Sequence, residues 1–99
     1  YWMAEAGADA LGMMRALGDR MKLYHINDRG TRIDGSAMTP ILKSDSMELG
    51  DGNMPLEGLI AQAKAVHVDA IILESNRNWV DRSPVSSFER SAAFLGRMV

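Results

Sequence analysis

Two side chains that can bind a divalent cation stand at the ends of short apolar segments in this sequence. His25 lies within the run Leu-Tyr-His-Ile-Asn-Asp at 23–28, and Glu74 closes the run Ile-Ile-Leu-Glu at 71–74. Imidazole and carboxylate ligands suit Mn, Mg, Co or Zn rather than a thiophilic metal. Each residue alone can be structural, and two ligands do not make a tight site. His25 and Glu74 are therefore candidate metal ligands only if the fold brings them together.

The segments that carry these residues are predicted to be strands at 21–27 and 69–74. Side chains alternate along a strand, so Leu23 and His25 share one face of the first, and Glu74 shares a face with Ile72 in the second. The second strand is almost entirely apolar, which is typical of a strand buried on both faces. A carboxylate in such a place is costly unless it is paired or bound to metal. If the strands are adjacent and parallel, about 4.8 Å apart, His25 and Glu74 at equal height can share one cation.

Helical patterns flank the two predicted strands. Asp9 is typical of an N-cap and predicts a helix over 9–17, which Gly18 ends. Pro55 opens a predicted helix at 55–65, and Ser83 followed by Pro84 opens another at 84–97. Between the first strand and the second helix lies a long loop, 28–54, without clear periodicity. The apolar side of the last helix is predicted to consist of Val85, Phe88, Ala92 and Leu95.

This order of elements is that of two consecutive β/α units of a (β/α)8 barrel, whose chemistry lies at the carboxyl ends of its strands. The chain has 99 residues, whereas a barrel needs roughly 250. It begins with Tyr1 rather than Met. We therefore expect a single partial barrel domain over 1–99, about a third of the whole, taken from a longer protein.

Other side chains are candidates for holding a substrate. Arg29 and Lys43, in the long loop, can bind a phosphate or carboxylate, or can be simply solvated charges. Trp79 follows Glu74 on the same rim and can stack on a sugar or cover the barrel edge. His67 precedes its strand, at the opposite rim, where residues serve stability. We expect His67 to be structural.

Composition excludes several classes of function. The net charge is −2 with no basic run, which disfavours nucleic-acid binding. No apolar stretch approaches the length of a membrane span. The absence of cysteine excludes disulfides and thiolate sites and fits a cytoplasmic protein. The eight methionines are interpreted as adaptable core filler.

The order of these motifs resembles a known family. A strand ending His-Ile-Asn-Asp at 25–28, the turn Leu-Gly-Asp-Gly-Asn at 49–53, a helix, and Ile-Ile-Leu-Glu at 71–74 are similar to the C-terminal part of the xylose-isomerase-like sugar isomerase/epimerase barrels. The resemblance covers almost the whole chain, around strands seven and eight with their flanking helices. It implies that His25 and Glu74 bind metal, and that Glu74 also moves a proton at the carbon next to a carbonyl. The segment 43–47 lacks the extra histidines of the endonuclease members, which argues against a multi-zinc nuclease site.

The resemblance predicts a metal-dependent sugar isomerase or epimerase that acts through an enediolate on a sugar or sugar phosphate. This chain would carry part of the active site and have little activity alone. Exposed strand edges predict self-association, or pairing with the missing barrel segment. Two alternatives stay open: a dehydratase of the same superfamily, and a folded fragment without catalysis.

Overall fold

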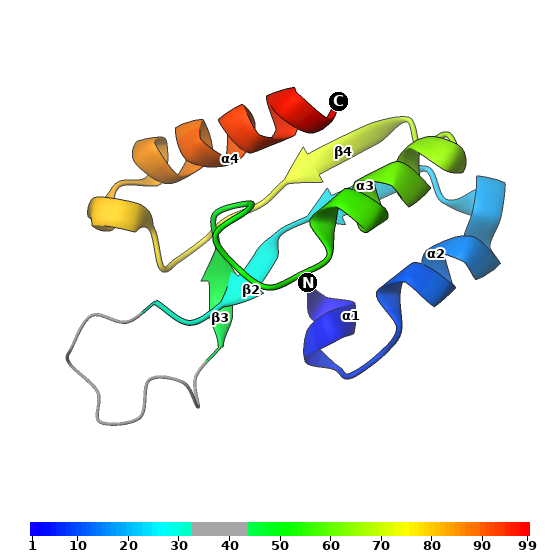
Figure 1. Cartoon of the computed structure of the whole chain (residues 1–99), viewed down its shortest axis with the longest axis horizontal. Coiled ribbons are helices and arrows are strands. Elements are labelled where there is room, and N and C mark those ends of the chain that lie inside the picture. The colour runs from blue at the N-terminus through cyan, green and yellow to red at the C-terminus, as the bar shows by residue number, and fades with distance from the viewer. Residues whose placement is uncertain (33–43) are drawn as a thin grey trace.

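The computed structural model describes residues 1–32 and 44–99, and its architecture is α/β (Figure 1). No helix among the described residues is long and apolar enough to cross a membrane. The helices are α1 (Trp2–Glu5), α2 (Ala10–Leu17), α3 (Leu56–Ala65) and α4 (Pro84–Met98), with 3-10 turns at Gly18–Arg20 and Val80–Arg82, and the strands are β1 (Leu23–Ile26), β2 (Asp28–Gly30), β3 (Asp45–Met47) and β4 (Ala70–Leu73).

The two predicted strands form a parallel pair, β1 with β4. Leu23 lies opposite Ala70 and His25 opposite Ile72. Because parallel strands need a crossover between them, the chain passes through α3 before it returns as β4. The predicted strands are confirmed, although each is shorter than expected at both ends. Their carboxyl ends therefore lie at the same edge of the sheet.

Helices cover one face of this strand pair. Tyr24 and Ile26 of β1 belong to a buried cluster with residues of α2 and α3, and β4 and α4 pack against it. On the other face Leu23 is 56% exposed and Ile72 is 43% exposed. The prediction that the second strand is buried on both faces is therefore wrong for the described residues. The alternation was read correctly, but only one side of the strands has helices to cover it.

The predicted helix starts are confirmed where a side chain caps them. The Asp9 carboxylate accepts a hydrogen bond from the Gly12 amide at 2.9 Å, and the Ser83 hydroxyl accepts one from the Ser86 amide at 3.2 Å. Each bond satisfies an amide that the helix itself cannot pair. Pro55 lies one residue before α3 rather than within its first turn.

The buried face of α4 differs from the predicted one. Its two buried residues are Ser87 and Ser91, whereas Val85 is 66% exposed and Phe88 is 38% exposed. The Ser91 hydroxyl accepts a hydrogen bond from the Leu49 amide at 3.1 Å. The prediction is right for Leu95, which packs against the core cluster, and wrong for Val85 and Phe88. The hydroxyl contacts of Ser87 and Ser91 could not be read from an apolar pattern.

The segment 28–54 was predicted to be an irregular loop, but part of it is regular. Its described parts contain β2 and β3, which pair antiparallel with Asp28 opposite Met47. Strands of three residues are too short for an alternating pattern to identify them. The turn that follows β3 needs glycine, because Gly50 has φ +92° and a Cβ on Gly52 would meet the Arg29 carbonyl oxygen.

One buried carboxylate holds this turn in place. Asp28 is 1% exposed, and its Oδ2 accepts hydrogen bonds from the amides of Gly50 at 3.0 Å and Gly52 at 2.9 Å. Its Oδ1 accepts bonds from the amides of Arg29 at 2.8 Å and Met54 at 3.1 Å. Four amide donors compensate for the loss of hydration of the carboxylate. Asp28 therefore joins the end of β1 to the segment that leads into α3.

We expect Asp28→Asn to lower the free energy of unfolding by about 3 kcal/mol, because an amide group in place of Oδ2 presents donors to two amide donors. Urea unfolding followed by circular dichroism measures the loss. Asp19→Asn, at an exposed position, is the matched control and should change stability by less than about 0.5 kcal/mol. Equal effects of the two substitutions would contradict a structural role for Asp28.

Candidate functional site

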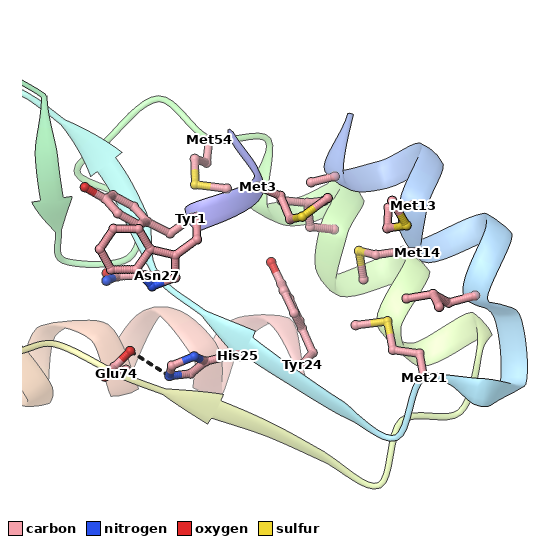
Figure 2. Close-up of a pocket in the computed structure, with 14 residues that line it drawn as sticks. Tyr1, Met3, Met13, Met14, Met21, Tyr24, His25, Asn27, Met54 and Glu74 are labelled. Atoms are coloured by element: carbon pink, nitrogen blue, oxygen red, sulfur yellow. Dashed lines mark ion pairs between the residues drawn. The ribbon is translucent and has the colours of Figure 1, made fainter. Parts of the chain in front are cut away.

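His25 and Glu74 meet at the carboxyl ends of β1 and β4. His25 lies within β1, and Glu74 is the first residue after β4, where its amide donates to the Ile26 carbonyl oxygen at 3.4 Å. The Nε2 atom of His25 lies 2.9 Å from Oε2 of Glu74. Figure 2 shows the two side chains pointing toward each other. The sequence-predicted pair is therefore brought together by the parallel strands.

The two residues are not at equal height in the sheet. His25 lies opposite Ile72, so Glu74 stands two residues further along its strand. The Glu74 side chain reaches back along the strand, so that its carboxylate contacts the imidazole of His25. The expectation of equal height was wrong because the sequence does not fix the register between two strands.

The pair is partly open to solvent. The side chain of His25 is 50% exposed and that of Glu74 is 45% exposed. The prediction of a buried carboxylate is therefore wrong for Glu74. An ion pair at such exposure adds little to stability. The pair is thus not needed to hold the fold, and both side chains remain accessible to a ligand.

His25 and Glu74 could supply two of the ligands that a divalent cation needs. Two ligands at right angles around a cation, each about 2.1 Å from it, lie about 3.0 Å apart. The observed 2.9 Å is close to that separation. Among residues 1–32 and 44–99, no third His, Cys, Asp or Glu joins these two. A cation held here would need further ligands from water, substrate or another segment.

Neighbouring carboxylates are committed elsewhere. Asp28 is held by its four amide donors, as described above. Glu48 is 4% exposed, and its Oε1 accepts hydrogen bonds from the Ser87 hydroxyl at 2.6 Å and the Val80 amide at 3.2 Å, while Oε2 pairs with Arg32. Burial alone would raise the pKa of Glu48, but the bonds from Ser87 and Arg32 outweigh it and lower that pKa below 4.5. Both carboxylates anchor loops.

None of the contacts described for the predicted substrate-binding residues Arg29 and Trp79 involves His25 or Glu74. Arg29 donates from Nε to Oε1 of Glu5 in α1 at 2.7 Å. The indole nitrogen of Trp79 is buried without a hydrogen-bond partner among the described residues. Lys43 lies outside the described residues. Whether these side chains bind a substrate stays a prediction.

His67 lies where the sequence predicted it, at the opposite end of the second strand. It follows α3 with φ +59° and precedes β4. Its side chain is exposed and lies beside Lys64 and Asp69, not near Glu74.

A cavity that the sequence did not predict lies next to the His25–Glu74 pair (Figure 2). Its volume is about 280 Å³, and its walls come from α1, α2, β1 and the start of α3. Asn27 and both members of the pair lie on its polar side. Methionine dominates the rest, so much of what we interpreted as core filler lines this space. The methionines of the wall are Met3, Met13, Met14, Met21 and Met54.

Tyr24 reaches into this cavity from β1 (Figure 2). Its side chain is buried, and its hydroxyl has no hydrogen-bond partner among the described residues. Burial, followed by the negative charge of Asp28, raises the pKa of Tyr24 from 10.0 to about 12. The phenol is therefore a neutral hydrogen-bond donor at physiological pH.

We expect Tyr24→Phe to leave stability at pH 7 unchanged or to raise it by up to about 1 kcal/mol, because the hydroxyl is buried without a partner. The phenol has a higher pKa in the folded chain than in the unfolded chain, so wild-type stability falls as pH rises from about 10 to 12. The variant has no phenol at this position, so its stability should not fall for this reason. Urea midpoints of both proteins from pH 8 to 12 measure it, and parallel curves would contradict the burial of Tyr24.

Comparison with known proteins identifies no relative: no protein-family model matches the chain, and none of the curated proteins is similar to it. The site is therefore defined by its geometry. That geometry is a half-exposed imidazole–carboxylate pair at the carboxyl ends of two parallel strands, beside an apolar cavity.

Proposed function

We propose that this chain contributes His25 and Glu74 to the divalent-cation site of a sugar isomerase or epimerase built on a (β/α)8 barrel. One observation carries the proposal. Nε2 of His25 and Oε2 of Glu74 lie 2.9 Å apart, at the carboxyl ends of adjacent parallel strands, with both side chains accessible. In β/α barrels this end of the strands is where catalytic groups lie.

The open face of the strands supports the barrel part of the proposal. Helices pack only against the Tyr24 and Ile26 side of β1, while Leu23 and Ile72 stay exposed on the other side. In a barrel the helices form the outer ring and the other strand face points inward. Pairing with the rest of such a barrel, or with a second copy, would cover the exposed apolar side chains.

The proposed chemistry divides between the two side chains. His25 offers an imidazole nitrogen as a ligand, and Glu74 offers one carboxylate oxygen as a ligand while the other can hold a proton. In an isomerisation Glu74 removes a proton from the carbon beside the carbonyl of a sugar and returns it to the neighbouring carbon. A divalent cation would polarise that carbonyl. A dehydratase would use the same two residues and expel water instead.

The proposal predicts weak cation binding by the chain alone, because the described residues supply two protein ligands. Mn²⁺ titration followed by electron paramagnetic resonance measures it. In the double variant His25→Ala, Glu74→Gln we expect binding to weaken by at least about tenfold, the loss that even an outer-shell partner can cause. We also expect little isomerase turnover by the 99-residue chain.

The matched control is the double variant His67→Ala, Glu57→Gln, which removes the same functional groups from two exposed positions. It should bind Mn²⁺ as the wild type does. If both double variants lose binding equally, or if the wild type binds no Mn²⁺ at millimolar concentrations, the metal-dependent function is contradicted and a folded segment without catalysis remains.

A further inference from the structure

Glu74 also lines a second pocket, which is small and polar. Asn27, Ser46 and Asn76 share its wall with Glu74. Asn27 follows β1, Asn76 follows β4 as Glu74 does, and Ser46 lies in β3. A group that enters this pocket therefore lies beside the Glu74 carboxylate, at the carboxyl ends of the paired strands.

The size of the pocket limits what it can hold. Its volume is about 10 Å³, which is roughly the space that one water molecule needs. A hydroxyl group is of this size, whereas a phosphate group or a sugar ring is larger. The pocket can therefore receive one hydroxyl of a molecule that lies mostly outside it.

The side chain of Ser46 is buried without a partner. Ser46 is 5% exposed, and its Oγ has no hydrogen-bond partner among the described residues. Its main chain is held on both sides, because its amide donates to Oδ1 of Asp45 at 2.8 Å and its carbonyl oxygen accepts from the Asn78 side chain at 2.8 Å. An unpaired buried hydroxyl costs stability. A ligand hydroxyl in the pocket would supply the missing partner.

The charges on the wall disfavour an anion. Asp45 and Glu74 are both carboxylates, and the Arg77 guanidinium is already paired with Asp45, with 2.8 Å between Nε and Oδ1. Ionised phosphate and carboxylate groups only accept hydrogen bonds, so they cannot pair with each other. A hydroxyl donates and accepts, so it can donate to a carboxylate while it accepts from Ser46 or from a side-chain amide.

We propose that this pocket binds one free hydroxyl group of the substrate, close to the carbon at which Glu74 acts. Because the pocket adjoins the proposed proton carrier, this assignment rests on the proposed function. It narrows the substrate class to molecules with a free hydroxyl, rather than a phosphate ester, at that position. Ser46 is then a positioning residue, which donates to the substrate oxygen and takes no part in proton transfer.

The probe is D-glucitol, an open-chain polyol without a carbonyl or phosphate group, and inorganic phosphate is the anionic comparison. The chain is acetylated at its amino group, because Tyr1 lines the pocket and a terminal charge would attract phosphate. We expect glucitol, without metal, to shift the side-chain amide signals of Asn27 and Asn76 in ¹⁵N–¹H spectra, and phosphate at the same concentration to shift neither. The signals of the exposed Asn53 should not move with either probe.

Two matched variants test the role of Ser46. Ser46→Ala should remain folded, since it removes a hydroxyl that has no partner among the described residues. We expect its dissociation constant for glucitol to be about three- to tenfold higher than that of the wild type, the effect of losing about one hydrogen bond. Ser86→Ala removes the same group from α4, outside the pocket, and should bind glucitol as the wild type does.

Equal shifts with phosphate and glucitol would overturn the inference, and so would equal affinities of Ser46→Ala and the wild type for glucitol. No shift with glucitol would also overturn it and leave a pocket that holds only water. Mn²⁺ titration separates this inference from the proposed function. A chain that binds Mn²⁺ but not glucitol keeps the function and loses the hydroxyl site, whereas one that binds glucitol but not Mn²⁺ keeps the hydroxyl site and loses the metal-dependent function.

Discussion

The parallel pairing of β1 with β4 is the interaction on which the other features depend. It requires the crossover through α3, and it directs the carboxyl ends of both strands to one edge. His25 and Glu74 are 49 positions apart in the sequence, and they meet only because of this pairing. Among the described residues, no strand pairs with the other edge of β1. The candidate cation site is thus a consequence of this strand pair.

Buried carboxylates, rather than apolar contacts alone, fix the segments around this strand pair. Asp28 holds the turn before α3 through main-chain amides, and Glu48 joins that turn to α4 through Ser87. Burying a carboxylate is favourable only with several donors in place. The half-exposed Glu74 differs from both, because its one side-chain ion pair is with His25 and the residue lies open to solvent. Accessibility to solvent distinguishes the candidate site.

Local signals in the sequence predicted much of the fold. Asp9 and Ser83 identified two helix starts because capping involves residues only three apart. Alternation placed Leu23 and His25 on one face of β1, and the structure shows that the opposite face is the buried one. The sequence could not show that β2 and β3 pair, since each has three residues, or that α4 turns Ser87 inward, since its partner Glu48 is distant in the chain.

The candidate site was predictable only in part, for the same reason. The placement of His25 and Glu74 on strand ends follows from short-range pattern, and their contact follows from parallel pairing. Their offset in register and their exposure depend on which elements cover the sheet, which no local pattern encodes. Likewise, Arg29 looked free for a substrate in the sequence because its partner Glu5 lies in a helix far from it in the chain.

The most direct test of the account is the ¹⁵N chemical shift of the imidazole nitrogens, followed by long-range proton–nitrogen correlation spectra during titration with Zn²⁺. The chain offers an internal comparison, because His25 and His67 are its two histidines. We predict that the Nε2 signal of His25 shifts until Zn²⁺ saturates the site while both nitrogen signals of His67 stay unchanged, and that Glu74→Gln weakens the response. Equal shifts at both histidines, or none at His25, would contradict the claim that the two strand ends converge on a cation.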